Sequence, residues 1–153
     1  MFRIAIAALV LMFSGAMGCD EGADNAYYLG YLPGPGQTVL VFEGTAARCK
    51  PNTSAPEGDP NRGKFTVGVT TEGTDGVLIL SMQFTSLTEM PAAGSYNIPA
   101  DATVTARVTP SGGSQTSLQF SGAFSVKAQG TTDGITISLP PSLPVSGTIN
   151  CAP

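Results

Sequence analysis

Apolar and polar side chains alternate along most of the chain beyond Gln37. A period of two places alternate side chains on opposite faces of a β-strand, so each alternating run predicts a strand with one buried face. No helical stripe with a period of about 3.6 residues appears after the N-terminal segment. A continuous apolar run at 39–42 opens the series, and the alternating runs are 65–69, 78–84, 102–108, 118–126, 135–139 and 145–151.

Turn-forming residues separate these runs. Asp75-Gly76 and Asp133-Gly134 each precede a predicted strand, and residues 111–114 are rich in glycine and serine. Short connections of this kind favour antiparallel hairpins. The pattern therefore predicts an all-β fold, a single antiparallel β-sandwich or a small open barrel of about seven to eight short strands. The segments 64–84 and 118–139 both contain such an Asp-Gly pair, which leaves an internal duplication open.

One run makes a specific prediction about the core. Phe120 and Phe124 share the parity of Leu118 and Val126 in the run 118–126. We therefore expect both phenylalanines on the buried face of one strand. Lys127 has the opposite parity and should face solvent.

The first 18 residues have the pattern of a secretory signal peptide. Arg3 is their only charged residue, residues 4–13 are all apolar, and mostly small residues lead to Cys19. This order of regions is typical of a secretory signal. The apolar run is too short to cross a bilayer as a helix, which needs about 20 residues. We therefore expect residues 1–18 to be removed.

The sequence Ala16-Met17-Gly18-Cys19 resembles the cleavage region of a bacterial lipoprotein precursor. In that family the cysteine sulfur receives a diacylglyceryl group and the signal is cut before it. The resemblance implies that Cys19 is lipidated and holds the protein to a membrane of the cell envelope. It favours the outer membrane or cell surface and leaves the periplasmic face of the inner membrane open. Ala16 and Gly18 also fit ordinary signal peptidase, with the same cut.

The mature chain divides into a tether and a domain. Residues 20–26 are mostly polar and have no apolar period, so we interpret 19–36 as the lipidated N-terminus with a flexible tether. The β-sandwich domain is predicted over 37–153. Three of the four tyrosines lie at Tyr27, Tyr28 and Tyr31. They indicate either a short first strand or an aromatic surface for glycan or lipid head groups.

The three cysteines predict one disulfide. If Cys19 is acylated, Cys49 and Cys151 remain as a pair in an oxidising compartment, where disulfides persist. Cys151 shares the parity of Val145 and Ile149, which we place inside. A Cys49–Cys151 bond requires the last strand to neighbour an early strand.

The composition excludes the enzyme classes that depend on histidine. The chain has a net charge of −4 and contains no histidine or tryptophan. Without histidine there is no Ser-His-Asp or Cys-His catalysis and no imidazole zinc ligand. The acidic balance also argues against a nucleic-acid partner. We predict no catalytic residue, no metal and no cofactor. A carboxylate-dependent hydrolase stays as a remote alternative, and Glu43 beside Gly44 is interpreted as an edge or bulge residue.

The longest irregular stretch, residues 50–63, follows Cys49. Glu57, Asp59 and Asn61 have the spacing of the first ligands of a calcium loop, but arginine and glycine stand where an EF-hand needs glycine and glutamate. We therefore interpret the stretch as a solvated loop. A protease inhibitor presenting this loop beside the disulfide remains an alternative, because a constrained loop loses less entropy on binding.

The sequence favours a lipid-anchored cell-envelope protein whose β domain is non-enzymatic. The domain either binds an unidentified protein or glycan or has a structural role. The order of acylated cysteine, tether, early cysteine and late cysteine resembles the layout of small surface lipoprotein antigens of mycobacterial type. That layout implies no particular activity.

Overall fold

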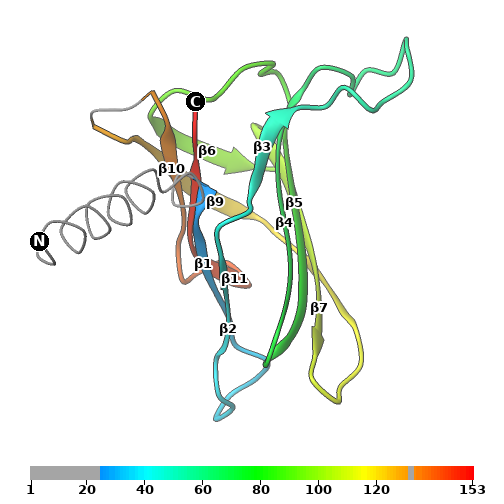
Figure 1. Ribbon diagram of the computed structural model, residues 1–153, viewed down its shortest axis with the longest axis vertical. Coiled ribbons are helices and arrows are strands. Elements are labelled where there is room, and N and C mark those ends of the chain that lie inside the picture. Colours follow the sequence, from blue (N-terminus) through cyan, green and yellow to red (C-terminus); the bar gives the residue numbers. More distant parts are fainter. Residues whose placement is uncertain (1–24, 131–132) are drawn as a thin grey trace, which may run out of the picture.

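The computed structural model describes residues 25–130 and 133–153 and is an open sandwich of two antiparallel sheets (Figure 1). The predicted signal peptide, Cys19 and the tether up to Asp24 lie outside the described residues. In spatial order, the six-stranded sheet contains β2 (Leu40–Gly44), β1 (Tyr27–Tyr31), β11 (Val145–Cys151), β10 (Ile135–Leu139), β9 (Gly122–Ala128) and β6 (Gly94–Ile98). The five-stranded sheet contains β3 (Arg48–Pro51), β4 (Phe65–Gly73), β5 (Gly76–Phe84), β7 (Ala102–Pro110) and β8 (Thr116–Gln119).

The predicted alternation is confirmed in the core. On β5, Leu78, Leu80, Met82 and Phe84 are at most 1% exposed, while Ile79 on the opposite face is 37% exposed. β7 shows the same pattern, with four inward apolar residues separated by outward threonines and Arg107. The apolar face of each strand is therefore directed between the layers, as two packed sheets require.

The prediction of seven to eight strands is too low, because the described residues alone form eleven. β3 and β6 are edge strands with little apolar alternation. Each pairs with one neighbouring strand only. Backbone hydrogen bonds to that neighbour, rather than the burial of one apolar face, make these segments strands. The domain also begins before the predicted boundary at residue 37. β1 lies between β2 and β11, with Tyr27 opposite both Gly44 and Ile149.

The run 118–126 is not one strand, which corrects the expected strand for Phe120 and Phe124. Leu118 belongs to β8 and Phe124 to β9, and these strands lie in different sheets. The chain crosses at residues 120–121, and Gly122 has a φ of +128° that favours glycine. Both phenylalanines are nevertheless buried, at 7% and 2% exposure.

The two segments considered for a duplication differ in structure. β4 and β5 form one hairpin of the five-stranded sheet, closed by Thr74 and Asp75. Residues 118–139 instead contain the end of β8 and two strands of the other sheet. The shared Asp-Gly pair therefore reflects turn chemistry at two unrelated places.

The Cys49–Cys151 disulfide is present and joins the two layers. The Cα atoms are 5.7 Å apart, within the usual range for such a bond. β3 and β11 are neighbours across the sandwich rather than within one sheet. The first described residue, Asn25, lies at the same end of the sandwich as the disulfide. Its backbone carbonyl accepts a hydrogen bond from Ala47 N at 3.1 Å, and its side-chain Oδ1 accepts one from Ala152 N at 2.9 Å.

Gly147 on β11 allows a close approach of β1. Its φ is +136°, and a Cβ atom at this position would overlap the carbonyl oxygen of Tyr28. We expect Gly147→Ala to lower the free energy of unfolding by more than about 1 kcal/mol, because alanine fits neither the conformation nor the space. Gly68→Ala is the control, since its Cβ would meet only Leu80 O at 4.0 Å. Urea unfolding of both variants checks this, and an equal loss in the two would contradict it.

Candidate functional site

A row of residues crosses the outer face of the five-stranded sheet and forms the base of the candidate site. The strand register places Arg48 opposite Gly68, Gly68 opposite Ser81, Ser81 opposite Thr105 and Thr105 opposite Gln119. Adjacent strands are about 4.8 Å apart, so this row spans about 19 Å from β3 to β8. We call it the transverse row.

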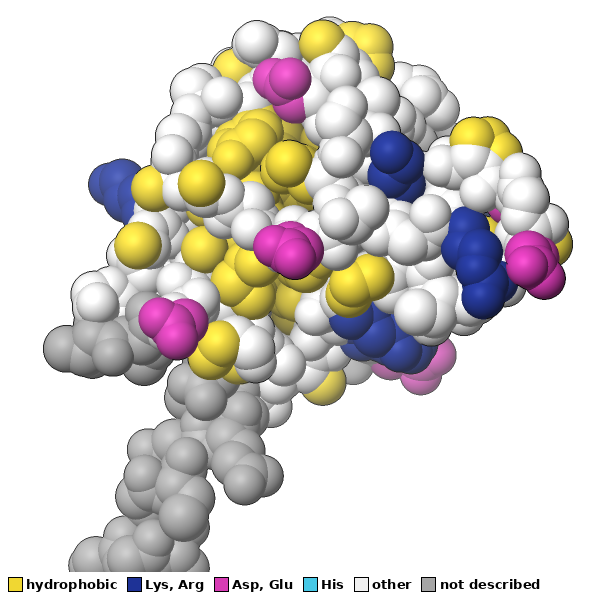
Figure 2. All heavy atoms as spheres, turned by 90° about the horizontal axis from the view of Figure 1, so that it is seen from above, with side chains coloured by type: hydrophobic (Ala, Val, Ile, Leu, Met, Phe, Trp, Pro, Cys, Tyr) yellow, Lys and Arg dark blue, Asp and Glu magenta, His cyan; other side chains and the backbone are white. Residues whose placement is uncertain are grey.

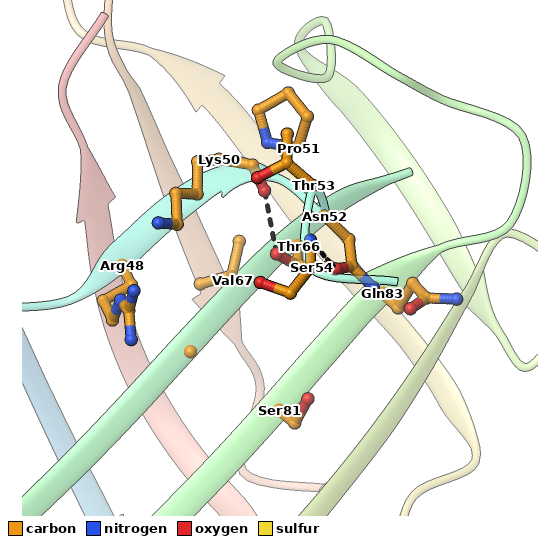
Figure 3. Close-up of a pocket in the computed structure, with 11 residues that line it drawn as sticks. Arg48, Lys50, Pro51, Asn52, Thr53, Ser54, Thr66, Val67, Ser81 and Gln83 are labelled. Carbon is orange, nitrogen blue, oxygen red and sulfur yellow. Dashed lines mark hydrogen bonds between the residues drawn. The ribbon is translucent and has the colours of Figure 1, made fainter. Parts of the chain in front are cut away.

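One end of the transverse row is a pocket of about 300 Å³ beneath the segment that follows β3 (Figure 3). Figure 3 shows Arg48 and Lys50 on β3, Thr66 on β4, and Ser81 and Gln83 on β5 around this space. The Thr66 hydroxyl donates to the Lys50 carbonyl at 2.8 Å and so fixes β3 against β4. The pocket is lined by hydroxyl, amide and cationic groups, which suits a polar ligand.

A second pocket of about 200 Å³ continues the surface across β5, β7 and β8. Ser81 lines both pockets, and Thr105, Arg107 and Gln119 line the second. The two pockets together follow the transverse row. We call them the transverse groove.

The groove is basic although the chain is acidic. Arg48, Lys50 and Arg107 are exposed on this face, and none has an ion-pair partner among the described residues. On the outward faces of these five strands the one carboxylate among the described residues is Glu72, four positions along β4 from Gly68 and therefore about 13 Å away. Seen from above, most visible Lys and Arg side chains gather on the side of the protruding segment after β3 (Figure 2).

That protruding segment is folded on itself. Asn52 N donates to Lys64 O, and Gly63 N donates to Asn52 O, both at 2.7 Å. Asp59 Oδ1 accepts from Asn61 N at 2.8 Å, so two of the residues with calcium-like spacing form a local turn.

The segment also forms one wall of the groove. Gln83 Nε2 on β5 donates to Asn61 Oδ1 at 3.0 Å, and Ser54 N donates to Asn52 Oδ1 at 3.1 Å. The first bond ties the segment to β5 through Asn61, the second shapes the turn at 52–54, and residues 52–54 line the pocket with residues of β4 and β5. The wall is therefore positioned by the sheet that it covers.

The other residues singled out from the sequence lie elsewhere. Glu43 is exposed on the edge strand β2, as interpreted, and lines a shallow pocket of about 360 Å³ with Tyr28. Tyr27 and Tyr31 are buried at 7% and 8% exposure, whereas Tyr28 is 54% exposed. The tyrosines therefore form a first strand, and an aromatic surface of three rings is absent from the described residues.

Among residues 25–130 and 133–153, the side chains that commonly bind metal ions do not gather at one place. No cluster of three or more Asp, Glu or Cys side chains lies together in this part of the chain. The pKa of Tyr96 is raised by burial and, to a smaller extent, by Asp101. Its hydroxyl donates to Ala92 O at 2.6 Å and its ring stacks on Phe124, so the shift reflects packing.

Comparison with protein-family models, with curated proteins and with solved structures found no match. No helix among the described residues is long and apolar enough to span a membrane. We therefore infer function from the described residues of this chain alone.

Proposed function

We propose that this chain is a lipid-anchored protein of the bacterial cell envelope whose sandwich acts as a binding domain, with the transverse groove as its binding surface. The observation that carries the proposal is the Cys49–Cys151 disulfide. It uses two of the three cysteines and leaves Cys19, directly after the signal-like segment, for acylation. Disulfides of this kind persist outside the reducing cytosol, where such a signal would direct the chain.

The groove supports binding rather than catalysis. Its polar side chains are hydroxyls, amides and unpaired cations, a few apolar residues such as Ile79 lie among them, and carboxylates and cysteines are absent from its lining. Such groups recognise a ligand through hydrogen bonds and charge. The lining contains no carboxylate, histidine or cysteine, the side chains that most often act as general acid, general base or thiol nucleophile.

The anchor brings one end of the sandwich to the membrane. Five residues separate Cys19 from Asn25, so a fully extended connection reaches about 20 Å. Asn25 lies at an end of β1 beside the last residues of β11. The sheet faces, including the groove, would then be directed along the membrane surface rather than onto it.

Replacement of Cys19 by serine should release the protein from membranes. The native chain should partition into the detergent phase of a detergent–water separation, because two or three acyl chains give stable anchoring whereas one is marginal. Cys19→Ser should lose this partitioning, and Lys127→Ser, which alters an exposed residue and leaves all three cysteines in place, is the control. Equal partitioning of the native chain and Cys19→Ser would overturn the anchor.

A further inference from the structure

We infer that the transverse groove binds an acidic polysaccharide, a chain rich in hydroxyl groups with carboxylates at intervals, laid across the strands from β3 to β8. The inference deepens the proposed function by naming the ligand class of the same site. It depends on the outer face of the five-stranded sheet and on the charges found there.

The cations fit carboxylates at separated positions. Arg48 stands at one end of the transverse row, with Lys50 two residues further along β3. Arg107 stands beside the far half of the row, two residues from Thr105 on β7. Arginine can hold a carboxylate through two parallel hydrogen bonds, and lysine acts as a point charge. A ligand that spans the row can therefore meet positive charge at its β3 end and beside Thr105 on β7.

The polar part of the remaining lining fits sugar hydroxyls, and Ile79 adds an exposed apolar side chain beside Arg107. Thr66, Ser81, Gln83, Thr105 and Gln119 present hydroxyl and amide groups to the same face. Ser81, Thr105 and Gln119 can both donate and accept hydrogen bonds, as sugar hydroxyls do, while Thr66 donates to Lys50 O and can still accept. Gly68 has no side chain, and a Cβ there would have only Leu80 O within 4 Å, at 4.0 Å. The row is therefore open where a chain must pass between Arg48 and Ser81.

Other polymers fit this surface less well. Single-stranded nucleic acids bind through aromatic stacking and dense positive charge, but the outward residues of these five strands include no aromatic ring. A peptide that adds a strand needs a free sheet edge, whereas the row crosses β4, β5 and β7, which are paired on both sides. A bilayer would meet the end of the sandwich before the groove if the chain is anchored at Cys19.

The test uses mature protein purified from native envelopes in detergent, with immobilised polygalacturonate as the probe and dextran as the neutral polymer. We expect binding to polygalacturonate that weakens as salt rises, because exposed charges are screened, and no binding to dextran. Absence of polygalacturonate binding, or equal binding to dextran, would overturn the ligand class.

Two kinds of variant test the location. Gly68→Leu fills the row between Arg48 and Ser81 at a position with space for a side chain, so it should fold and weaken binding by about ten-fold or more. Arg48→Ser and Lys50→Ser should each weaken binding, whereas Lys127→Ser, which removes the same charge from an exposed position on β9, should not. Thermal unfolding verifies that each variant is folded. Unchanged binding in folded Gly68→Leu, or an equal loss in Lys127→Ser, would overturn the site.

The same protein preparation also distinguishes polysaccharide binding from lipid-headgroup binding, and a failure of the ligand proposal from a failure of the anchor proposal. Protein that prefers phosphatidylglycerol vesicles to phosphatidylcholine vesicles, with the preference lost in Gly68→Leu, would replace the polysaccharide by lipid headgroups and overturn the inference. The polygalacturonate assay needs no acyl group. Failure to bind with a lipidated Cys19 therefore overturns the ligand alone, and binding with an unmodified Cys19 overturns the anchor alone.

Discussion

Replacing both Cys49 and Cys151 by serine should lower the free energy of unfolding by about 3–5 kcal/mol. The two cysteines are 102 residues apart, so the bond closes most of the described chain into one loop. In the chain-entropy model a loop of about 100 residues restricts the unfolded state by about 4.7 kcal/mol. Both sulfurs lie at the end of the sandwich where the chain enters, so without the bond β3 is held to the core mainly by its pairing with β4.

Urea unfolding of the double serine variant against the native chain measures this loss. Each single variant should be at least as destabilised as the double variant, because one serine already removes the bond. The native chain treated with a reductant is the second control and should approach the variants. Equal stability of native and double variant, or labelling of both thiols in the folded native protein, would contradict the cross-link.

Phe124→Ala should lower the free energy of unfolding by about 3–5 kcal/mol. The ring is 2% exposed and belongs to an aromatic cluster, 5.9 Å from Phe84 and 5.6 Å from Tyr96 between ring centroids. Removing it leaves a cavity between the two sheets, because Phe84 belongs to β5 and Tyr96 to β6. Such a loss is a large part of the total stability of about 5–15 kcal/mol that is typical of a domain.

Lys127→Ala is the matched control for Phe124→Ala, since it removes an exposed side chain three residues further along β9. It should change stability by less than about 0.5 kcal/mol. Phe120→Ala should also be strongly destabilising, because this ring is 7% exposed even though it lies between strands. Equal effects of Phe124→Ala and Lys127→Ala would contradict the assignment of the two faces of β9.

The strands with one buried face could be predicted because burial imposes the period of two directly on the sequence. β5 and β7 carry nine residues each, and their inward positions were predicted correctly. β3 and β6 carry no such signal, since their edge positions leave most side chains exposed. The crossing at Phe120 was missed because the residues keep the same alternation while the chain passes from one sheet to the other. Strand order therefore depends on tertiary packing that local periodicity does not record.

The disulfide could be predicted from the number of cysteines and the parity of Cys151, but the transverse groove could not. Its row joins Arg48, Gly68, Ser81, Thr105 and Gln119, which come together only through the register of five strands. The available signal was that the outward positions of four alternating runs are rich in threonine, serine and glutamine with scattered cations. That composition also describes an ordinary solvated sheet face, so the groove appears only once the strand pairing is fixed.

The intact mass of the mature protein, taken from its native envelope without reduction, tests the central claim most directly. We predict a chain that begins at Cys19, carries a diacylglyceryl group on that residue, and is lighter by two hydrogens because Cys49 and Cys151 are bonded. Fragmentation should place the added mass on the first residue. An unmodified Cys19, or a chain that retains residues 1–18, would contradict the account of a lipid-anchored envelope protein.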